Sequence, residues 1–186
     1  MEHGDGLNRG RHAGAAGDSD VTPLGGGMPS PGSAAPELSL LDQYGCEFRL
    51  SQHRGHWVVV YFYQHDGAPG CVKEAQDFAA AYTAFTLRGI EVVGISIDTV
   101  ESHRRFAERL NLPFRLLADP DAAVSKRYGV YVKRFSHGRP YWGVRRTTFL
   151  IDPRGEIAKV FAGVKPVGHA AAVVAAIDDL VRNGNR

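Results

Sequence analysis

Residues 61–71 read Tyr-Phe-Tyr-Gln-His-Asp-Gly-Ala-Pro-Gly-Cys, and this stretch decides the fold. Its start belongs to a continuous β-branched and aromatic run over residues 57–63, which predicts a strand buried on both faces. Pro69 suits the first position of a helix, because the N–H that proline lacks is not needed there. The sequence therefore predicts a strand, a short loop and a helix, with Cys71 in the first turn of that helix.

A cysteine in the first turn of a helix is well placed for chemistry. The unpaired N–H groups and the positive end of the helix dipole both favour negative charge there, and the thiolate is the nucleophilic form of cysteine. Packing as a small buried hydrophobic residue is the alternative for Cys71. The apolar stripe of the helix points the Cys71 side chain toward the sheet; its members are Ala75, Phe78, Ala79, Tyr82 and Phe85.

The rest of the chain alternates strand and helix signals. Two strands at 38–40 and 47–50 flank a glycine-bearing turn at 42–45, which indicates a hairpin. The further elements that we predict are a helix over 70–87, a strand over 90–97, a helix over 101–110, a strand over 114–117, a helix over 122–128, a hairpin of 147–151 with 157–161, and a helix over 168–181. This order predicts an α/β, thioredoxin-like fold, with a mixed central sheet, helices on both faces and an N-terminal β-hairpin.

The composition fits one folded domain behind a polar tail. A chain of 186 residues suits a single domain, and 44% hydrophobic residues suffice for its core. Residues 1–34 are rich in Gly, Asp, Ser and Pro, so we expect a disordered tail over 1–34 and the domain over 35–186. A partner-binding arm is an alternative for the tail, and translation from Met28 is another.

Several function classes are disfavoured. The net charge of +2 is small and its basic residues are scattered, so we expect neither nucleic acid nor a membrane as partner. We find no apolar run that could span a bilayer and no signal-peptide core, and two cysteines cannot build a disulfide framework. These features favour a reducing, cytoplasmic location with free thiols. The eight histidines show no paired metal-ligand spacing, so no metal is expected.

Two separated segments carry a family resemblance. Residues 61–78, YFYQHDGAPGCVKEAQDF, resemble the active-site signature of Q-type peroxiredoxins, also called bacterioferritin comigratory proteins. Residues 138–157, GRPYWGVRRTTFLIDPRGEI, are similar to a later family segment, and residues 32–45 and 96–114 follow the family as well. The resemblance spans about residues 32–181. It implies a thiol peroxidase that reduces hydrogen peroxide and organic hydroperoxides without a bound cofactor.

The resemblance also implies roles for individual residues. It makes Cys71 the attacking cysteine, Arg146 the arginine that stabilises thiolate and leaving oxygen, and Glu74 the residue that orients this arginine. Cleavage of a peroxide needs a thiolate and donors for the developing negative charge, and N–H groups near Gly70 can supply some of these. The alternatives are a solvated strand-edge residue for Arg146 and a first-turn acid for Glu74. Arg145 is the rival of Arg146, but strand alternation points it to the other face.

The sequence departs from the family at two positions near the substrate. Gln64 stands where the family has proline, and Ala68 stands where it has a threonine or serine whose hydroxyl binds peroxide. With Gly70 these are the substrate-binding positions that the resemblance implies. Loss of one such donor costs about 10²–10³-fold in rate. The alternative function is therefore a catalytically weak redox sensor or a thioredoxin-fold binding module, unless His65 replaces the donor.

The cysteine positions favour a one-cysteine mechanism. Many Q-type members carry a resolving cysteine five residues after the first, and Gln76 stands there. We interpret Cys46 as a strand residue packed under the sheet. The oxidised Cys71 is then reduced by an external thiol, which is thioredoxin, glutaredoxin or a low-molecular-weight thiol. We expect a monomer or weak homodimer. A thiol–disulfide oxidoreductase is a further rival, disfavoured because the chain has no C-x-x-C pair.

Overall fold

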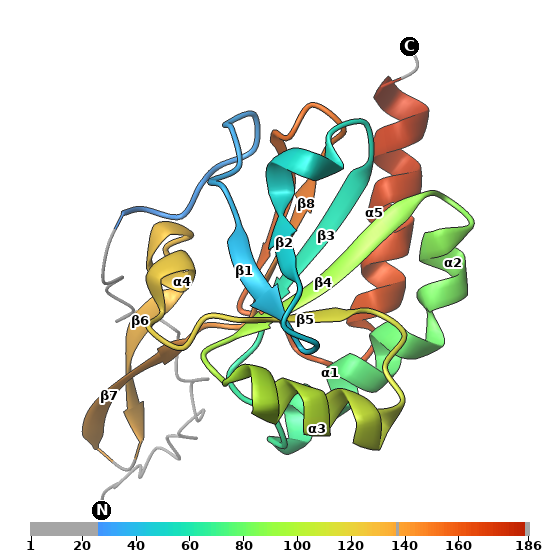
Figure 1. The fold of residues 1–186 in the computed structure, drawn as a ribbon. Coiled ribbons are helices and arrows are strands. Elements are labelled where there is room, and N and C mark those ends of the chain that lie inside the picture. The colour runs from blue at the N-terminus through green and yellow to red at the C-terminus, as the bar shows by residue number, and fades with distance from the viewer. Residues whose placement is uncertain (1–25, 137, 185–186) are drawn as a thin grey trace, which may run out of the picture.

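The fold is built on one large mixed sheet (Figure 1), seen in a computed structural model that describes residues 26–136 and 138–184. The sheet has the strand order β2-β1-β5-β4-β3-β8-β9, and β6 pairs only with β7. The strands are β1 Ser39–Asp42, β2 Glu47–Arg49, β3 Trp57–Phe62, β4 Ile90–Ser96, β5 Arg115–Ala118, β6 Tyr131–Ser136, β7 Arg139–Val144, β8 Thr147–Ile151 and β9 Ile157–Ala162. The helices are α1 Pro69–Ala80, α2 Tyr82–Thr86, α3 Val100–Leu110, α4 Ala123–Arg127 and α5 His169–Gly184, with a 3-10 turn at Leu50–His53.

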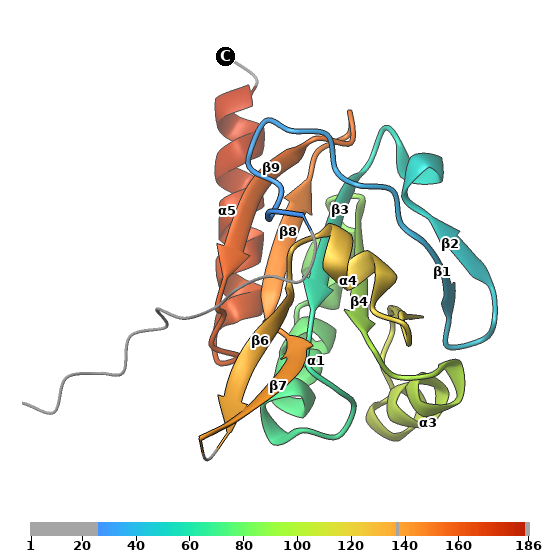
Figure 2. The ribbon, with the colours of Figure 1, turned by 90° about the vertical axis from the view of Figure 1, so that its left-hand side faces the viewer.

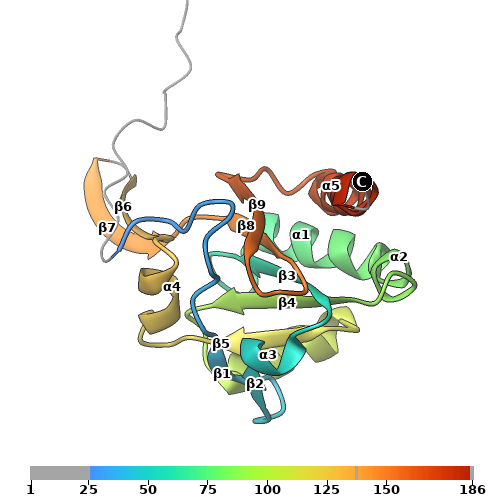
Figure 3. The same cartoon turned by 90° about the horizontal axis from the view of Figure 1, so that it is seen from above.

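Strand β3 lies near the centre of the sheet and is buried on both faces, as its sequence predicts. Val59 and Tyr61 join the core cluster that α1, α3 and α5 cover, whereas Val58 and Val60 join the cluster on the other face with α4. Seen from above (Figure 3), α1 and α5 lie on the side of the sheet away from α4. The predicted mixed sheet, the helices on both faces and the N-terminal hairpin β1–β2 are therefore confirmed.

The helix predicted over 70–87 is two helices, so that prediction is wrong in one respect. Ala81 ends α1 and begins α2, and a short-range bond from the Ala84 N–H to the Ala81 carbonyl (2.9 Å) tightens the chain there. The change of direction lets Phe85 pack against Phe78, with ring centroids 5.9 Å apart and both side chains fully buried. Tertiary packing overrides the helical pattern at this point, since the alanines carry no stop signal.

The hairpin β6–β7 has no counterpart among the predicted elements. It projects away from the main sheet (Figure 2) and pairs antiparallel from Tyr131↔Val144 to Ser136↔Arg139. Its outer part carries exposed aromatic side chains, among them Phe135 and Trp142. A strand that buries neither face of its outer half shows no apolar alternation, and this is why the sequence does not reveal it.

The N-terminal segment reaches the domain earlier than expected. Of the predicted tail over 1–34, residues 1–25 lie outside the described residues. Residues 26–34 pack on the domain: the Gly32 N–H donates to the Ile157 carbonyl (2.8 Å), Ala34 bridges Glu156, and Met28 packs against the core. The start of β9 supplies backbone partners for this segment, so packing with the domain begins before residue 35.

Cys46 is exposed, so its interpretation as a residue packed under the sheet is wrong. Its backbone closes the β1–β2 turn: the Asp42 N–H donates to the Cys46 carbonyl (2.8 Å) and the Cys46 N–H donates to Asp42 Oδ1 (3.0 Å). A residue held by its backbone in a tight turn can leave its side chain in solvent. Within 26–136 and 138–184, we find no helix with the length and apolar character needed to cross a bilayer.

Candidate active site

Cys71 occupies the third position of α1, with Ala68 as the N-cap residue and Pro69 first in the helix. Its side chain is only 1% exposed and joins the core cluster under α1. The Val72 N–H already donates to the Ala68 carbonyl (2.9 Å), whereas the N–H groups of Gly70 and Cys71 have no acceptor inside the helix. Cys71 therefore lies in the first turn of α1, at the positive end of the helix dipole.

Arg146 reaches Cys71 because of the pairing between β3 and β8. These strands are antiparallel, and Phe62 at the end of β3 pairs with Thr147 at the start of β8. Arg146, one residue before β8, is thereby placed beside the loop that follows β3. Its Nη2 donates to Cys71 Sγ at 3.2 Å, and its Nε donates to Glu74 Oε2 at 2.8 Å.

Gly70 lies close to the Arg146 guanidinium. A Cβ atom at that position would lie 3.2 Å from Arg146 Nη2 and 3.5 Å from Pro166 Cγ, so a side chain would press on the guanidinium. The loop after β9 is also fixed to the site, because the Val164 N–H donates to the Arg146 carbonyl at 3.1 Å. The first turn of α1, Arg146 and this loop therefore pack together around the sulfur.

Burial and neighbouring charges shift the pKa values of the site residues in opposite directions. Burial raises the pKa of Glu74 to about 7, although the positive charge and hydrogen bond of Arg146 lower it. Burial alone would lower the pKa of Arg146, but the charges of Glu74 and Cys71 outweigh it and raise that pKa. Glu74 is fully buried, and its Oε1 has no hydrogen-bond partner among the described residues. Burial thus favours the neutral form of the carboxyl, whereas Arg146 favours its ionised form.

His169 is a buried neighbour of the site that sequence reasoning missed. Its Nε2 lies 2.8 Å from Thr148 Oγ1 in β8, and it begins α5 between the rings of Phe78 and Phe161. Burial lowers the pKa of His169 to about 4, and the charge of Arg146 adds to this. Its place at a helix start gave no signal, because only the fold brings it to β8.

The two positions that depart from the family pattern lie in the loop before α1. Gln64 is half-buried, and Ala68 is half-buried with its methyl group packed against the core. Ala68 gives the helix no side-chain cap. His65, the other candidate donor, is exposed and its Nδ1 lies 3.1 Å from the Asp66 carbonyl oxygen. The structure brings Cys71, Glu74 and Arg146 together; it leaves His65 on the surface.

Comparison with known proteins identifies the family of this chain. A sequence model of the AhpC/TSA family matches residues 31–160, which include Cys71, Glu74 and Arg146. The chain belongs to this peroxiredoxin family. Peroxiredoxin Bcp of Bacillus subtilis is 36% identical over 149 residues, which cover 80% of this chain and 95% of that protein.

Solved peroxiredoxin structures share the fold. The bacterioferritin comigratory protein of Xanthomonas campestris, described for its alkyl peroxide reduction, is 36% identical with a TM-score of 0.73, over 76% of this chain and 90% of its own. A PrxQ variant from Xylella fastidiosa is 28% identical with a TM-score of 0.79, over 84% of this chain and 99% of its own. The thioredoxin-like fold predicted from the sequence is confirmed. This peroxiredoxin is a thiol peroxidase, with a peroxide as substrate and a thiol reductant such as thioredoxin.

Proposed function

We propose that this peroxiredoxin reduces hydrogen peroxide and organic hydroperoxides at Cys71 by a one-cysteine cycle. The Cys71 thiolate attacks the terminal peroxide oxygen, the O–O bond breaks, and the other oxygen leaves as an alkoxide or hydroxide that takes up a proton. Cys71 becomes a sulfenic acid. One external thiol condenses with it to a mixed disulfide and water, and a second thiol releases Cys71 with formation of an external disulfide.

The single observation that carries this proposal is the position of Arg146, which hydrogen-bonds to both Cys71 Sγ and Glu74. A guanidinium at the sulfur stabilises the thiolate, and the same group can stabilise the negative charge on the leaving oxygen. We assign Glu74 to hold the guanidinium in place. The N–H groups of Gly70 and Cys71 face the peroxide as further donors. Ala68 and Gln64 line the substrate position.

The one-cysteine cycle is supported by the places of the other candidate residues. Gln76, five residues after Cys71, is exposed and carries no thiol. Cys46 belongs to the β1–β2 turn, and three strands, β1, β5 and β4, separate β2 from β3 in the sheet. Both cysteines are free. An external reductant, which is thioredoxin, glutaredoxin or a low-molecular-weight thiol, therefore completes the cycle.

The choice of substrate and setting belongs to the same proposal. Alkyl peroxide reduction is described for the Xanthomonas campestris relative, and we extend it to this chain together with hydrogen peroxide. We further propose a cytoplasmic monomer or weak homodimer with no nucleic-acid or membrane partner. Elution of the reduced protein in size-exclusion chromatography, at concentrations from low to high micromolar, tests the oligomeric state.

Stopped-flow oxidation of the reduced protein by hydrogen peroxide and by a bulky organic hydroperoxide tests the chemistry. We expect rapid oxidation of wild type and Cys46→Ser, and none of Cys71→Ser. Steady-state turnover with thioredoxin or a small thiol should follow. If Cys71 is oxidised rapidly once but the protein shows no steady-state turnover with a thiol, the protein is a redox sensor instead. A stoichiometric Cys46–Cys71 disulfide after one peroxide equivalent, mapped by mass spectrometry, would contradict the one-cysteine cycle.

A further inference from the structure

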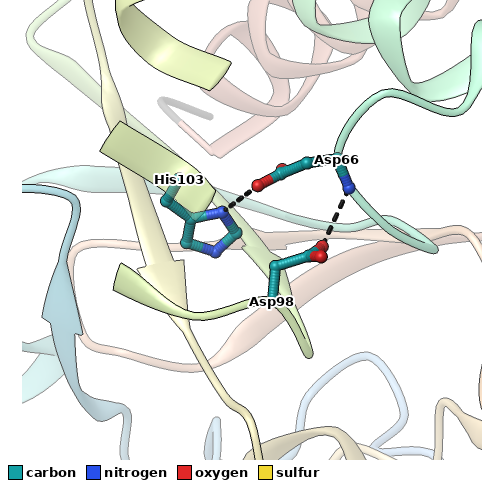
Figure 4. A group of neighbouring side chains, drawn as sticks. All are labelled: Asp66, Asp98 and His103. Carbon is teal, nitrogen blue, oxygen red and sulfur yellow. Dashed lines mark hydrogen bonds and ion pairs between the residues drawn. The ribbon is translucent and has the colours of Figure 1, made fainter. Parts of the chain in front are cut away.

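A second group of polar side chains, buried or half-buried, lies against the loop that leads into α1. Asp66 comes from this loop, Asp98 follows β4, and His103 belongs to the start of α3 (Figure 4). Ser102 precedes His103 in the same helix. Together with Tyr63 at the end of β3, we call this group the loop clamp. It is separate from Arg146 and Glu74, and none of the roles assigned so far uses it.

The carboxylate of Asp66 is fully engaged in the loop clamp. Its Oδ1 accepts from the Tyr63 hydroxyl (2.8 Å), and its Oδ2 accepts from the Ser102 hydroxyl (2.8 Å) and from His103 Nδ1 (3.0 Å). The Asp66 N–H donates to Asp98 Oδ2 at 2.8 Å, and the Ser96 hydroxyl donates to the same oxygen at 2.6 Å. Both the side chain and the backbone of Asp66 are therefore fixed to β4 and α3.

His103 ties the loop clamp to the sheet. Its ring is fully buried; Nδ1 faces the Asp66 carboxylate, and Nε2 faces the Leu117 carbonyl oxygen of β5 at 3.2 Å. The ring therefore bridges the loop carboxylate on one side and the backbone of β5 on the other, and the Tyr63 hydroxyl lies 3.3 Å from its Nδ1. Burial alone would raise the pKa of Asp66, but hydrogen bonding and charge from His103, with help from Tyr63 and Ser102, lower it.

The spacing of the loop clamp resembles a metal site, but its hydrogen bonds give another explanation. One ligand atom each from Asp66, Asp98 and His103 lies within 4.8 Å of the others. In this structure Asp66 and Asp98 already accept hydrogen bonds from the loop, β4 and α3, and both ring nitrogens of His103 have polar partners. The group is therefore built as a set of hydrogen bonds that holds the loop.

The start of α1 has little local support of its own. Its N-cap residue Ala68 offers no side-chain acceptor. Gly67 has a φ of +78°, a backbone conformation that residues other than glycine rarely adopt. An uncapped first turn that follows a glycine is prone to fray. The clamp holds Asp66, which is one residue before that glycine. Its tertiary contacts therefore stabilise the first turn of α1 in place of the missing N-cap.

We propose that Asp66 and His103 are positioning residues for the peroxidase reaction. By holding the loop before α1, they keep the first-turn N–H groups and Cys71 aligned with Arg146, although neither residue touches the sulfur. The inference rests on the proposed role of Cys71. It predicts that weakening the clamp lowers the reaction with peroxide, which needs the whole arrangement. The reaction with a simple alkylating reagent should stay undiminished, since it needs an accessible thiolate but no donors for a leaving oxygen.

Two substitutions of His103 separate the halves of the clamp. In a Cys46→Ser background, His103→Asn keeps a donor near the Nδ1 position and so the bond to Asp66, whereas His103→Gln keeps one near Nε2 and so the bond to Leu117. We expect His103→Gln and Asp66→Asn to lower the rate of Cys71 oxidation by hydrogen peroxide about tenfold. His103→Asn should stay within about twofold of the parent. Asp178→Asn, which breaks the exposed pair with Arg88, is the matched control.

Three readouts decide the outcome. Iodoacetamide should alkylate Cys71 in the slow variants at least as fast as in the parent, and hydrogen exchange should rise in peptides covering 63–70. The proposal would be overturned if His103→Gln reacted with peroxide as fast as the parent. It would also be overturned if His103→Asn and His103→Gln lost the same factor in this rate. If His103→Gln does not fold, Ser102→Ala removes one donor to the same carboxylate, and unchanged exchange over 63–70 there would overturn it. Failure of the parent to react with peroxide would count against the role of Cys71 instead.

Discussion

Two carboxylates lie near the start of α1, half-buried Asp66 in the loop before it and fully buried Glu74 within it, and their oxygens have different numbers of hydrogen-bond partners. Both oxygens of Asp66 accept hydrogen bonds, and its pKa is lowered. Glu74 has one oxygen bonded to Arg146 and one without a partner among the described residues, and its pKa is raised to about 7. A carboxylate with all its hydrogen bonds made holds the local structure in place. A buried carboxylate with one oxygen unbonded keeps part of its desolvation cost, and Glu74 does so next to Arg146 and Cys71.

The difference reflects how each carboxylate's main partner is held. Both ring nitrogens of His103 have fixed partners, the Asp66 carboxylate and the Leu117 carbonyl oxygen. Arg146 gives its Nε to Glu74 and its Nη2 to Cys71, so its strength as a donor is divided between the carboxylate and the sulfur. We infer that the loop clamp holds geometry and the Glu74–Arg146 pair supplies charge to the reaction. The predictions below separate the two pairs.

The largest effect is expected at Arg146. Arg146→Lys keeps the charge but loses the planar fork that contacts Glu74 and Cys71 together. The rate of Cys71 oxidation by hydrogen peroxide should fall about 10²–10³-fold, well beyond the loss expected from the loop clamp. Single-turnover stopped flow measures it, with Arg88→Lys at an exposed ion pair as control. A loss below threefold would assign the donors at the sulfur to other groups.

A smaller effect concerns stability and pH at Glu74. With a folded-state pKa of about 7 against an ordinary value of 4.5, the folded protein keeps a proton that the unfolded chain releases. The free energy of unfolding should therefore fall as pH rises from 4.5 to about 7, by about 3 kcal/mol. Glu74→Gln should lack this part of the dependence. Urea denaturation at several pH values measures the difference between the two proteins.

His169 acts with the opposite sign over nearly the same range. Its pKa of about 4 lies below the ordinary 6.5, so its contribution is lost as pH falls from 6.5 toward 4. The contribution of the Glu74 carboxyl is therefore the difference in free energy of unfolding between wild type and Glu74→Gln at each pH. Glu108→Gln, on the exposed side of α3, is the control. Identical pH profiles for wild type and Glu74→Gln would show that Arg146 keeps Glu74 ionised throughout.

The smallest effect is a gain at Ala68. Its φ of −62° and ψ of 133° suit an N-cap residue, so the hydroxyl of Ala68→Thr can accept from the N–H groups of the first turn. We expect the free energy of unfolding to rise by about 1 kcal/mol and the loop to rely less on the clamp. His103→Gln should then cost less in an Ala68→Thr background. Ala68→Val, of similar shape without the hydroxyl, should give neither gain.

The sequence predicted the parts of the site that depend on local signals or motifs. The strand, the loop and the first turn around Cys71 could be predicted because β-branched runs and Pro69 mark them, and family resemblance pointed to Arg146 and Glu74. The partners of Asp66 could not be predicted, because Asp98 and His103 come from other elements and only the fold brings them together. His103 lies within the buried stripe of α3 with Phe106 and Ala107, where its position looks like packing.

The outer elements were harder for a related reason. The β6–β7 hairpin buries little of its outer half, so the alternation that marks a strand is missing there. The exposure of Cys46 depends on backbone bonds of a turn, which residue type does not specify. The core strands, in contrast, carry their burial in their composition, and all five residues of β8 are buried.

The pairing of Phe62 with Thr147 determines which arginine lies beside Cys71. A slip of β8 by one residue along β3 would bring Arg145 to the place of Arg146, so a guanidinium would still stand at the sulfur. The same slip would exchange the two faces of Thr147–Ile151 and turn each core side chain toward the wrong layer. An insertion or deletion in the segment 145–151 should therefore destabilise the fold even where it leaves an arginine beside Cys71.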